Sequence, residues 1–172
     1  MKKTTKKYRT ELQIGPSNER EIVEASFDLI KSVDCYTPEN RDLMIQKLDR
    51  LKEEDFNRVL IPDFEYKVDG NVVTYNVDFI KGYGIGTFIP QFADVVYEDV
   101  VTRESDWSFA DYHMVNFIVE YKTDKLYAID FQSYGYLSNR KYRELRWKEC
   151  REKDSTRLNE IMKGGWIKPR GW

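Results

Sequence analysis

The chain has 172 residues, of which 41% are hydrophobic and 15% aromatic, and its formal net charge is −2. This length suits one domain or two small lobes around one cleft, and the composition argues against a disordered chain. No apolar run is long enough to cross a bilayer, and the basic N-terminus lacks the apolar segment of a signal peptide. Two cysteines and one histidine argue against a disulfide framework and against a structural zinc site. We therefore expect a cytoplasmic protein with no membrane partner.

Charge is distributed unevenly along the chain. Residues 1–9 carry five basic residues and no acid, and residues 140–172 carry eleven basic and five acidic residues, so the middle is strongly acidic. The basic C-terminal run either docks on this acidic body or binds an anionic partner such as nucleic acid. We favour docking, because basic runs that contain aromatic residues also describe an amphipathic helix packed on its own domain.

The N-terminal part predicts a small sheet followed by a helix. Weak alternation predicts strands over residues 8–15 and 20–25, and a stronger pattern predicts one over residues 27–33. A helix is predicted from Thr37, an N-cap residue that precedes a proline, to about Glu54. Its apolar residues recur at helical spacing and are Met44, Leu48 and Leu51.

The next elements follow a strong turn signal. Asp69-Gly70 predicts a hairpin between strands over residues 64–68 and 72–80. Three glycines in residues 81–86 predict a flexible connector, and a helix is predicted over residues 90–103. Because the sequence lacks both the P-loop and the Rossmann pattern at these glycines, a joint between lobes is the favoured interpretation.

A second hairpin and a long helix complete the chain. Strands over residues 117–121 and 126–131 are separated by a polar turn. A charged helix is predicted from Ser138 to about Met162, where Gly164 and the glycine after it end it. The order of elements predicts an α+β chain, with an antiparallel sheet and one helix first and a smaller, mostly helical part second.

Three polar residues lie at the outer ends of the second hairpin. Asp111 and Asn116 precede its first strand, and Asp130 ends its second strand. Because a hairpin brings its outer ends together, we expect the three side chains to converge. A proton-accepting carboxylate, an amide oxygen and a second carboxylate are the groups that Mg²⁺-dependent phosphoryl transfer uses. The alternative is that these residues are a turn and a strand-end cap.

The motifs around these residues resemble those of a protein-kinase-like fold. Asp111-Tyr-His-Met-Val-Asn116 resembles the D-x-H-x-x-N catalytic loop of aminoglycoside-phosphotransferase-like kinases, and Ala128-Ile129-Asp130-Phe131 resembles the metal-binding Asp-Phe that follows it. Upstream, Leu29–Lys31 resembles the strand of the phosphate-binding lysine, Gly15–Glu19 resembles a shortened RIO-type phosphate loop, and Val77–Gly82 resembles the hinge.

The resemblance implies a minimal form of this fold. Residues 1–81 form a nucleotide-binding N-lobe, a small antiparallel sheet with one helix. Residues 82–172 form a reduced, mostly helical C-lobe that carries the catalytic-loop hairpin and the basic C-terminal helix. The implied activity is transfer of the ATP γ-phosphate to an unknown hydroxyl acceptor, with ATP and Mg²⁺ as cofactors.

The same resemblance assigns a role to each site residue. Asp111 is the catalytic base and Lys31 pairs with the ATP phosphates. Asn116 and Asp130 hold Mg²⁺. The remaining cofactor-binding residues lie in the phosphate loop and the hinge, and are Gly15, Ser17, Asn18, Asp78 and Ile80.

Departures from the family pattern keep other hypotheses open. Gln132 replaces the glycine that usually follows Asp-Phe, and the acid that pairs with Lys31 is either Glu39 or Asp42. His113, the single histidine, is expected to pack or hydrogen-bond within the loop. The second hypothesis is a pseudokinase or nucleotide-binding interaction module with a protein partner. The third is a nucleic-acid-associated protein that uses its basic termini.

Overall fold

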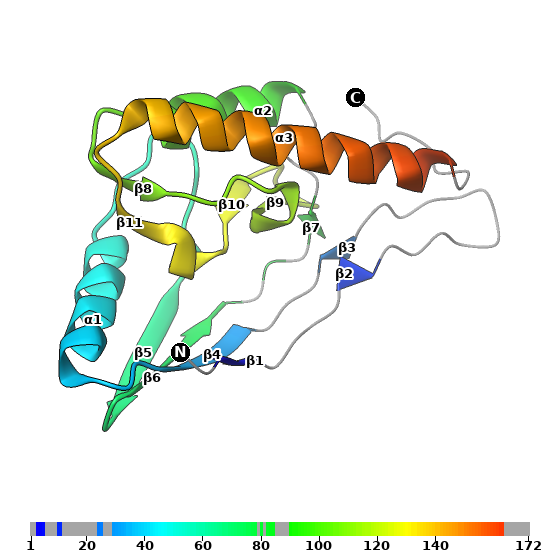
Figure 1. Cartoon of the computed structure of the whole chain (residues 1–172). Coiled ribbons are helices and arrows are strands. Elements are labelled where there is room, and N and C mark those ends of the chain that lie inside the picture. The colour runs from blue at the N-terminus through cyan, green and yellow to red at the C-terminus, as the bar shows by residue number, and fades with distance from the viewer. Residues whose placement is uncertain are drawn as a thin grey trace.

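The molecule is a mixed α+β structure built from small antiparallel sheets and helices (Figure 1). This computed structural model describes residues 3–5, 10–11, 24–25, 29–78, 80, 82–84 and 90–163. The helices are α1 (Pro38–Lys52), α2 (Pro90–Val96) and α3 (Arg140–Lys163). α2 and α3 lie side by side at one end of the molecule and α1 lies at the other (Figure 1). The predicted α+β class is confirmed.

The largest ladders belong to a four-stranded antiparallel sheet. Its strands, in spatial order, are β1 (Lys3–Thr5), β4 (Leu29–Asp34), β6 (Val72–Val77) and β5 (Phe64–Asp69). The predicted hairpin at Asp69-Gly70 is confirmed as β5–β6, with Gly70 at a φ of +57° in the turn. β6 ends at Val77, earlier than predicted.

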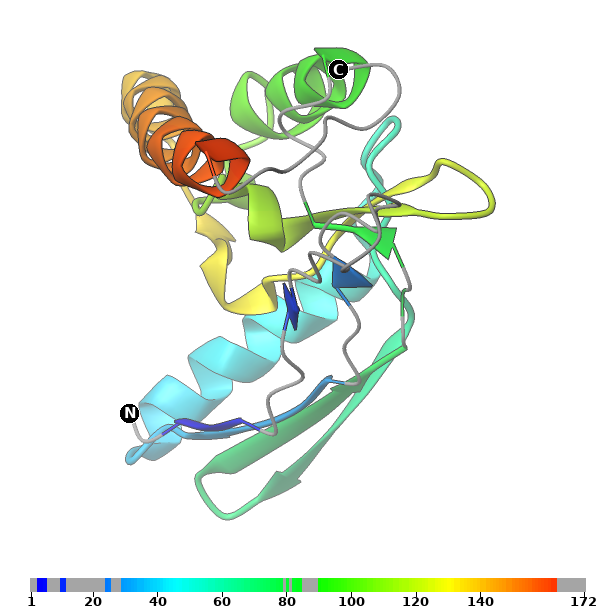
Figure 2. The same ribbon diagram turned by 90° about the vertical axis from the view of Figure 1, so that its right-hand side faces the viewer.

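α1 lies across one face of this sheet (Figure 2). Thr37 is its N-cap and accepts a hydrogen bond from the backbone N–H of Asn40 at 3.2 Å, as the sequence predicts. The three predicted apolar residues are buried: Met44, Leu48 and Leu51. Burial of this stripe anchors α1 on the sheet.

A second antiparallel sheet spans both halves of the sequence. Its strands, in order, are β10 (Leu126–Ala128), β9 (Phe117–Glu120), β7 (Gly82–Tyr83), β3 (Glu24–Ala25) and β2 (Thr10–Glu11). The predicted second hairpin is confirmed as β9–β10. β2 and β3 precede the predicted boundary at residue 81, and β3 pairs with β7, which follows it; the division into two lobes itself stays a prediction.

The predicted flexible connector includes a strand instead. Gly82 and Tyr83 form β7, which pairs with both β3 and β9. A Cβ atom added at Gly82 would overlap the backbone carbonyl of Val119. The glycine is therefore required by the close approach of two strands, and its role here is packing.

The predicted helix over residues 90–103 consists of two parts. α2 ends at Val96 and continues as a π-helical turn, Tyr97–Val101. Asp99 of this turn is buried, and its carboxylate accepts hydrogen bonds from the backbone N–H groups of Arg58 and Val59. This contact ties the segment after α1 to the end of α2.

α3 docks on the body of the molecule. It begins after Asn139, whose side chain accepts a hydrogen bond from the N–H of Tyr142, so the cap is one residue later than the predicted Ser138. Cys150 of α3 belongs to the same hydrophobic core as Leu48 of α1 and Ile118 of β9. This supports the docking interpretation of the basic run. No helix in the described part of the chain is both long and apolar enough to span a membrane.

Candidate functional site

Two strand pairings bring the backbone segments that contain Asp111, Asn116 and Asp130 side by side. The third small sheet pairs β8 (Trp107–Phe109) with β11 (Tyr134–Tyr136), and the N–H of Ala110 donates to the carbonyl of Ser133 at 3.0 Å. Beside it, β9 and β10 pair, and the N–H of Ile129 donates to the carbonyl of Asn116 at 3.0 Å. Asp130 lies between these two contacts, so its neighbours are the residues around Asp111 and Asn116.

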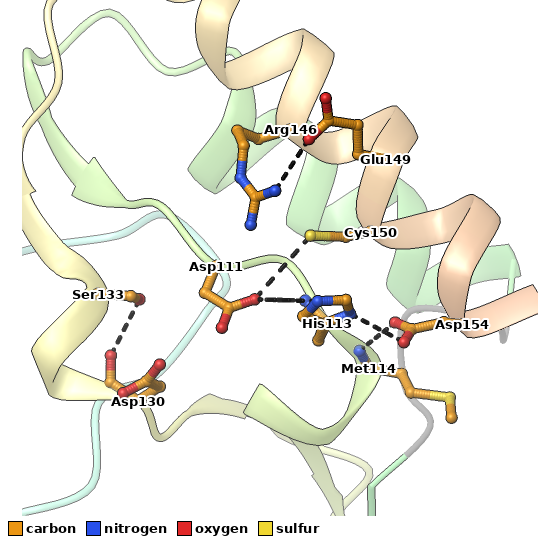
Figure 3. A network of polar contacts seen from close by, with 9 residues as sticks. All are labelled: Asp111, His113, Met114, Asp130, Ser133, Arg146, Glu149, Cys150 and Asp154. Carbon is orange, nitrogen blue, oxygen red and sulfur yellow. Dashed lines mark hydrogen bonds and ion pairs between the residues drawn. The ribbon is translucent and has the colours of Figure 1, made fainter. Parts of the chain in front are cut away.

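Asp111 is held by its own loop. Its carboxylate accepts a hydrogen bond from the N–H of His113 at 3.2 Å and one from the thiol of Cys150 at 3.9 Å. The side chain is 34% exposed. Asn116 ends the 3-10 turn Met114–Asn116, and both Asn116 and Asp130 are partly exposed. The close-up shows Asp111 and Asp130 in the same region of the molecule, below α3 (Figure 3).

Lys31 lies on the sheet face that packs against Asp130. It is directly opposite Tyr75 of β6, so both side chains project from the same face. Tyr75 is buried, and its ring stacks on Phe131 with centroids 5.8 Å apart. Burial and the negative charge of Asp130 raise the pKa of Tyr75. The predicted lysine and the predicted metal-binding aspartate are therefore connected through the Tyr75–Phe131 contact.

The sequence predicted that α1 would supply an acidic partner for Lys31, but the α1 residue found at the site is a lysine. Glu39 and Asp42 are both exposed, and Asp42 pairs with its neighbour Arg41 on the helix surface. Lys47 of α1 instead reaches the site and donates to the backbone carbonyl of Gln132 at 3.0 Å. Sequence reasoning missed Lys47, which reads as one of several charged residues on the polar side of an amphipathic helix.

The remaining predicted nucleotide-binding residues are not shown to contact Asp111, Asn116 or Asp130. Asp78 is exposed and lines an open hollow of about 650 Å³ with Lys52 and Asp63, where β5 begins and β6 ends. Ile80 is a buried residue of the core. The predicted phosphate-loop residues lie outside the described part of the chain: Gly15, Ser17 and Asn18.

α3 contributes two residues that sequence reasoning did not assign to the site. Asp154 is 5% exposed, and its carboxylate contacts His113 Nδ1 at 2.9 Å and accepts a hydrogen bond from the N–H of Met114 at 2.7 Å. Cys150 is fully buried, and burial raises the pKa of its thiol. The sequence predicted that His113 would pack or hydrogen-bond within the loop; its backbone N–H does so, whereas its side chain hydrogen-bonds to α3. The sequence does contain one relevant pattern: Cys150 and Asp154 are four residues apart, which places them on the same face of the predicted helix.

Comparisons with protein-family models, with curated proteins and with solved structures return no significant match. The chemistry of the site is therefore the basis on which a function is proposed.

Proposed function

We propose that the protein is a minimal kinase-like phosphotransferase, which transfers the γ-phosphate of ATP to a hydroxyl acceptor with the help of Mg²⁺. The supporting observation is that backbone hydrogen bonds join the segments containing Asp111, Asn116 and Asp130, next to the sheet face that bears Lys31. Protein kinases use the same order along the chain: a lysine strand, a helix, a loop with a base and an asparagine, and an Asp-Phe pair.

Asp111 would act as the general base. Its hydrogen bond from the N–H of His113 fixes its orientation, and its exposed fraction of 34% leaves room for a substrate hydroxyl. A positioned base of this kind contributes about 10²- to 10⁴-fold in rate. The acceptor hydroxyl would donate its proton to the Asp111 carboxylate as the hydroxyl oxygen attacks phosphorus.

Asn116 and Asp130 would hold Mg²⁺, and Lys31 would pair with phosphate oxygens. An amide oxygen and a carboxylate fit this ion, because Mg²⁺ prefers hard oxygen ligands and keeps part of its hydration shell. Bound Mg²⁺ would neutralise negative charge on the phosphates. Most of the catalytic effect would come from positioning and charge neutralisation by the residues around it.

A thermal-shift experiment with ATP and Mg²⁺ tests nucleotide binding. At about 100 times its dissociation constant, a ligand stabilises the native state by about 2.7 kcal/mol, which corresponds to a Tm increase of roughly 5–10 °C for a chain of this size. We expect Asp130→Asn to lose most of this increase. Asp124→Asn is the matched control, because it makes the same change in the turn of the same hairpin, where Asp124 is exposed and has a φ of 54° that asparagine tolerates. No increase for the wild-type protein at millimolar ATP would contradict the proposal.

Turnover tests the transfer step. We expect Mg²⁺-dependent consumption of ATP in the presence of candidate hydroxyl acceptors, reduced about 10²-fold or more in Asp111→Ala. Binding of ATP should persist in this variant, since Asp111 is not assigned to the nucleotide. Equal turnover in the wild type and Asp111→Ala would remove Asp111 from the mechanism.

One observation favours a second candidate, a nucleotide-binding module without transfer activity. Protein kinases pair their strand lysine with a glutamate of the following helix, whereas the α1 side chain that reaches the Asp130–Gln132 segment is Lys47. In this case ATP and Mg²⁺ would raise the Tm in an Asp130-dependent way, and no acceptor would be phosphorylated. Phosphoryl transfer that depends on Asp111 would exclude this candidate.

A further inference from the structure

A mixed group of nitrogen, sulfur and oxygen ligands lies on the α3 side of Asp111. The ligand atoms of Asp111, His113 and Cys150 all lie within 4.8 Å of one another. The Asp111 carboxylate oxygen Oδ1 is 3.9 Å from the Cys150 sulfur and 3.9 Å from His113 Nε2. In a tetrahedral zinc site with bonds of 2.0–2.3 Å, neighbouring ligand atoms are about 3.3–3.6 Å apart. The separations therefore exceed coordinating distances by a few tenths of an ångström to at most about 1.5 Å.

The orientation of His113 is already set for a metal. Its Nδ1 atom is 2.9 Å from a carboxylate oxygen of Asp154, and the other oxygen of Asp154 accepts a hydrogen bond from the N–H of Met114 (Figure 3). With Nδ1 as donor to Asp154, Nε2 carries the free lone pair, and this atom faces Asp111. A carboxylate that holds the outer nitrogen of a histidine is the usual outer-shell partner of a metal ligand.

The site combines a buried ligand with exposed ones. Cys150 is fully buried on α3, whereas the side chains of Asp111 and His113 are 34% and 28% exposed, so a cation can reach the group from solvent. The surrounding charges are mixed: Asp154 is negative, and Arg146, which pairs with Glu149 at 2.9 Å, is positive. Burial raises the pKa of the Cys150 thiol, and Arg146 acts in the opposite direction. Metal binding deprotonates a coordinating thiol.

We propose that Asp111, His113 and Cys150 bind one Zn²⁺ ion, with Asp154 as the outer-shell partner of His113 and a fourth position open to water. Sulfur and imidazole ligands select zinc and related soft ions over Mg²⁺. The zinc site is thus chemically separate from the oxygen pair of Asn116 and Asp130, although Asp111 is adjacent to both. Three protein ligands and one open position are also the arrangement of zinc sites that exchange a ligand.

Direct metal binding tests the proposal without any assay of activity. The probe is Zn²⁺ or Co²⁺ alone, added to the full chain without an affinity tag after treatment with a chelator. We expect one Zn²⁺ per chain by titration calorimetry, and a Co²⁺ complex with a thiolate-to-metal charge-transfer band that Zn²⁺ displaces.

Variants identify the ligands. Cys150→Ser and His113→Gln should each lose the charge-transfer band and weaken Zn²⁺ binding by more than the ~10–100-fold expected for the outer-shell variant Asp154→Asn. Cys35→Ser is the matched control, because Cys35 is also a buried free cysteine and lies outside the group. Saturable binding that persists in both Cys150→Ser and His113→Gln overturns the proposal, as does the absence of binding to the wild type. If Cys150→Ser does not fold, the Co²⁺ spectrum and the Zn²⁺ affinity of His113→Gln decide the matter.

One consequence rests on the proposed function. Zn²⁺ at this site takes the carboxylate that would serve as the base, so Zn²⁺ should suppress Mg²⁺-dependent turnover and a chelator should restore it. A protein that binds Zn²⁺ as described and shows no turnover would refute the phosphotransferase and leave the metal site intact. Turnover that stays constant at saturating Zn²⁺ would show that Asp111 cannot be both the catalytic base and a zinc ligand.

Discussion

Tyr112 fills the space between the loop of Asp111 and helix α3. Its side chain is fully buried, and its ring lies edge-on to Trp147 with centroids 6.0 Å apart. The hydroxyl group is buried as well, and it has no hydrogen-bond partner among the residues that the structure describes. Burial of an unsatisfied polar group costs about 1–3 kcal/mol. The ring of Tyr112 therefore stabilises the fold, whereas its hydroxyl group destabilises it.

Tyr112→Phe should increase the free energy of unfolding by about 1 kcal/mol, because it removes the unsatisfied hydroxyl and keeps the ring. Urea denaturation measures this change. The control is Tyr136→Phe, which should have almost no effect, because Tyr136 is 62% exposed and its hydroxyl makes one long contact of 3.4 Å with Asp106. A loss of stability in Tyr112→Phe would mean that the hydroxyl is satisfied in solution.

At the scale of an element, α3 is attached through a buried arginine. Arg143 is fully buried and donates to three backbone carbonyls, those of Leu137 at 2.9 Å, Arg103 at 3.1 Å and Ser105 at 2.6 Å. Desolvation lowers its pKa. The guanidinium group, with five donors in a planar fork, connects the start of α3 to the segment before β8.

Arg143→Met should reduce the free energy of unfolding by about 3 kcal/mol, because it leaves three partly buried carbonyl groups without their donor. Arg140→Met is the matched control: Arg140 lies on the same helix, is exposed, and donates to the carbonyl of Glu104 in the same segment. We expect a change of about 0.5 kcal/mol or less for this control. Equal losses in the two variants would show that burial of Arg143 does not matter.

A second prediction at this scale concerns β7. Gly82→Ala should destabilise the protein by about 2 kcal/mol or more, because the new methyl group would collide with the backbone of Val119 and push β7 away from β9. Gly135→Ala is the control: Gly135 lies in β11, and no heavy atom lies within 4 Å of the position of an added Cβ. Thermal melts of both variants check the difference, and similar Tm values would contradict the close approach of β7 and β9.

At the scale of the whole molecule, buried phenols predict sensitivity to alkaline pH. Desolvation raises the pKa of Tyr75, Tyr112 and Tyr134 above the usual value of 10. Their contribution to stability is complete below pH 10 and decreases as pH rises towards their folded pKa values, because the unfolded state ionises first. Each group then removes about 1.4 kcal/mol per pH unit. The buried thiols of Cys35 and Cys150 act with the same sign from about pH 9.

Urea denaturation at several pH values between 9 and about 12 measures this slope. Tyr75→Phe should flatten the tyrosine part of the slope by about one third, since it removes one of three equivalent ionisations. Tyr36→Phe should leave the slope unchanged, because Tyr36 is 54% exposed. Stability that is constant above pH 10 would contradict the burial of all three phenols.

Most of the elements that could be predicted are encoded by short sequence patterns. The Thr37-Pro38 start of α1 and the Asp69-Gly70 turn encode their structure within a few residues, and both are confirmed. The β8–β11 pairing joins strands of three residues each that are 25 positions apart in the register Phe109–Tyr134, and such short strands give no periodic signal. The π-helical continuation of α2 escaped prediction for a similar reason, since its side chains follow the same apolar pattern as an α-helix.

The candidate site also has one part that could be predicted from local sequence and one part that could not. The β9–β10 hairpin could be predicted because its strands are close in the sequence, and it is confirmed; the convergence of the Asp111, Asn116 and Asp130 side chains stays a prediction. Lys47 and Asp154 come from separate helices, and their positions depend on how α1 and α3 pack. That packing is set by tertiary contacts such as those of Arg143, which no local pattern contains.

The five-stranded sheet has a mechanical consequence. Strand pairing connects β3 to β7 and β7 to β9, so a strand from the first half of the chain is linked through β7 to a strand from the second half. Two-lobed enzymes commonly admit a ligand by rotating one lobe about a joint. In this molecule such a rotation would shear the ladder at Gly82–Tyr83, so we expect β3 and β9 to keep a fixed orientation relative to each other.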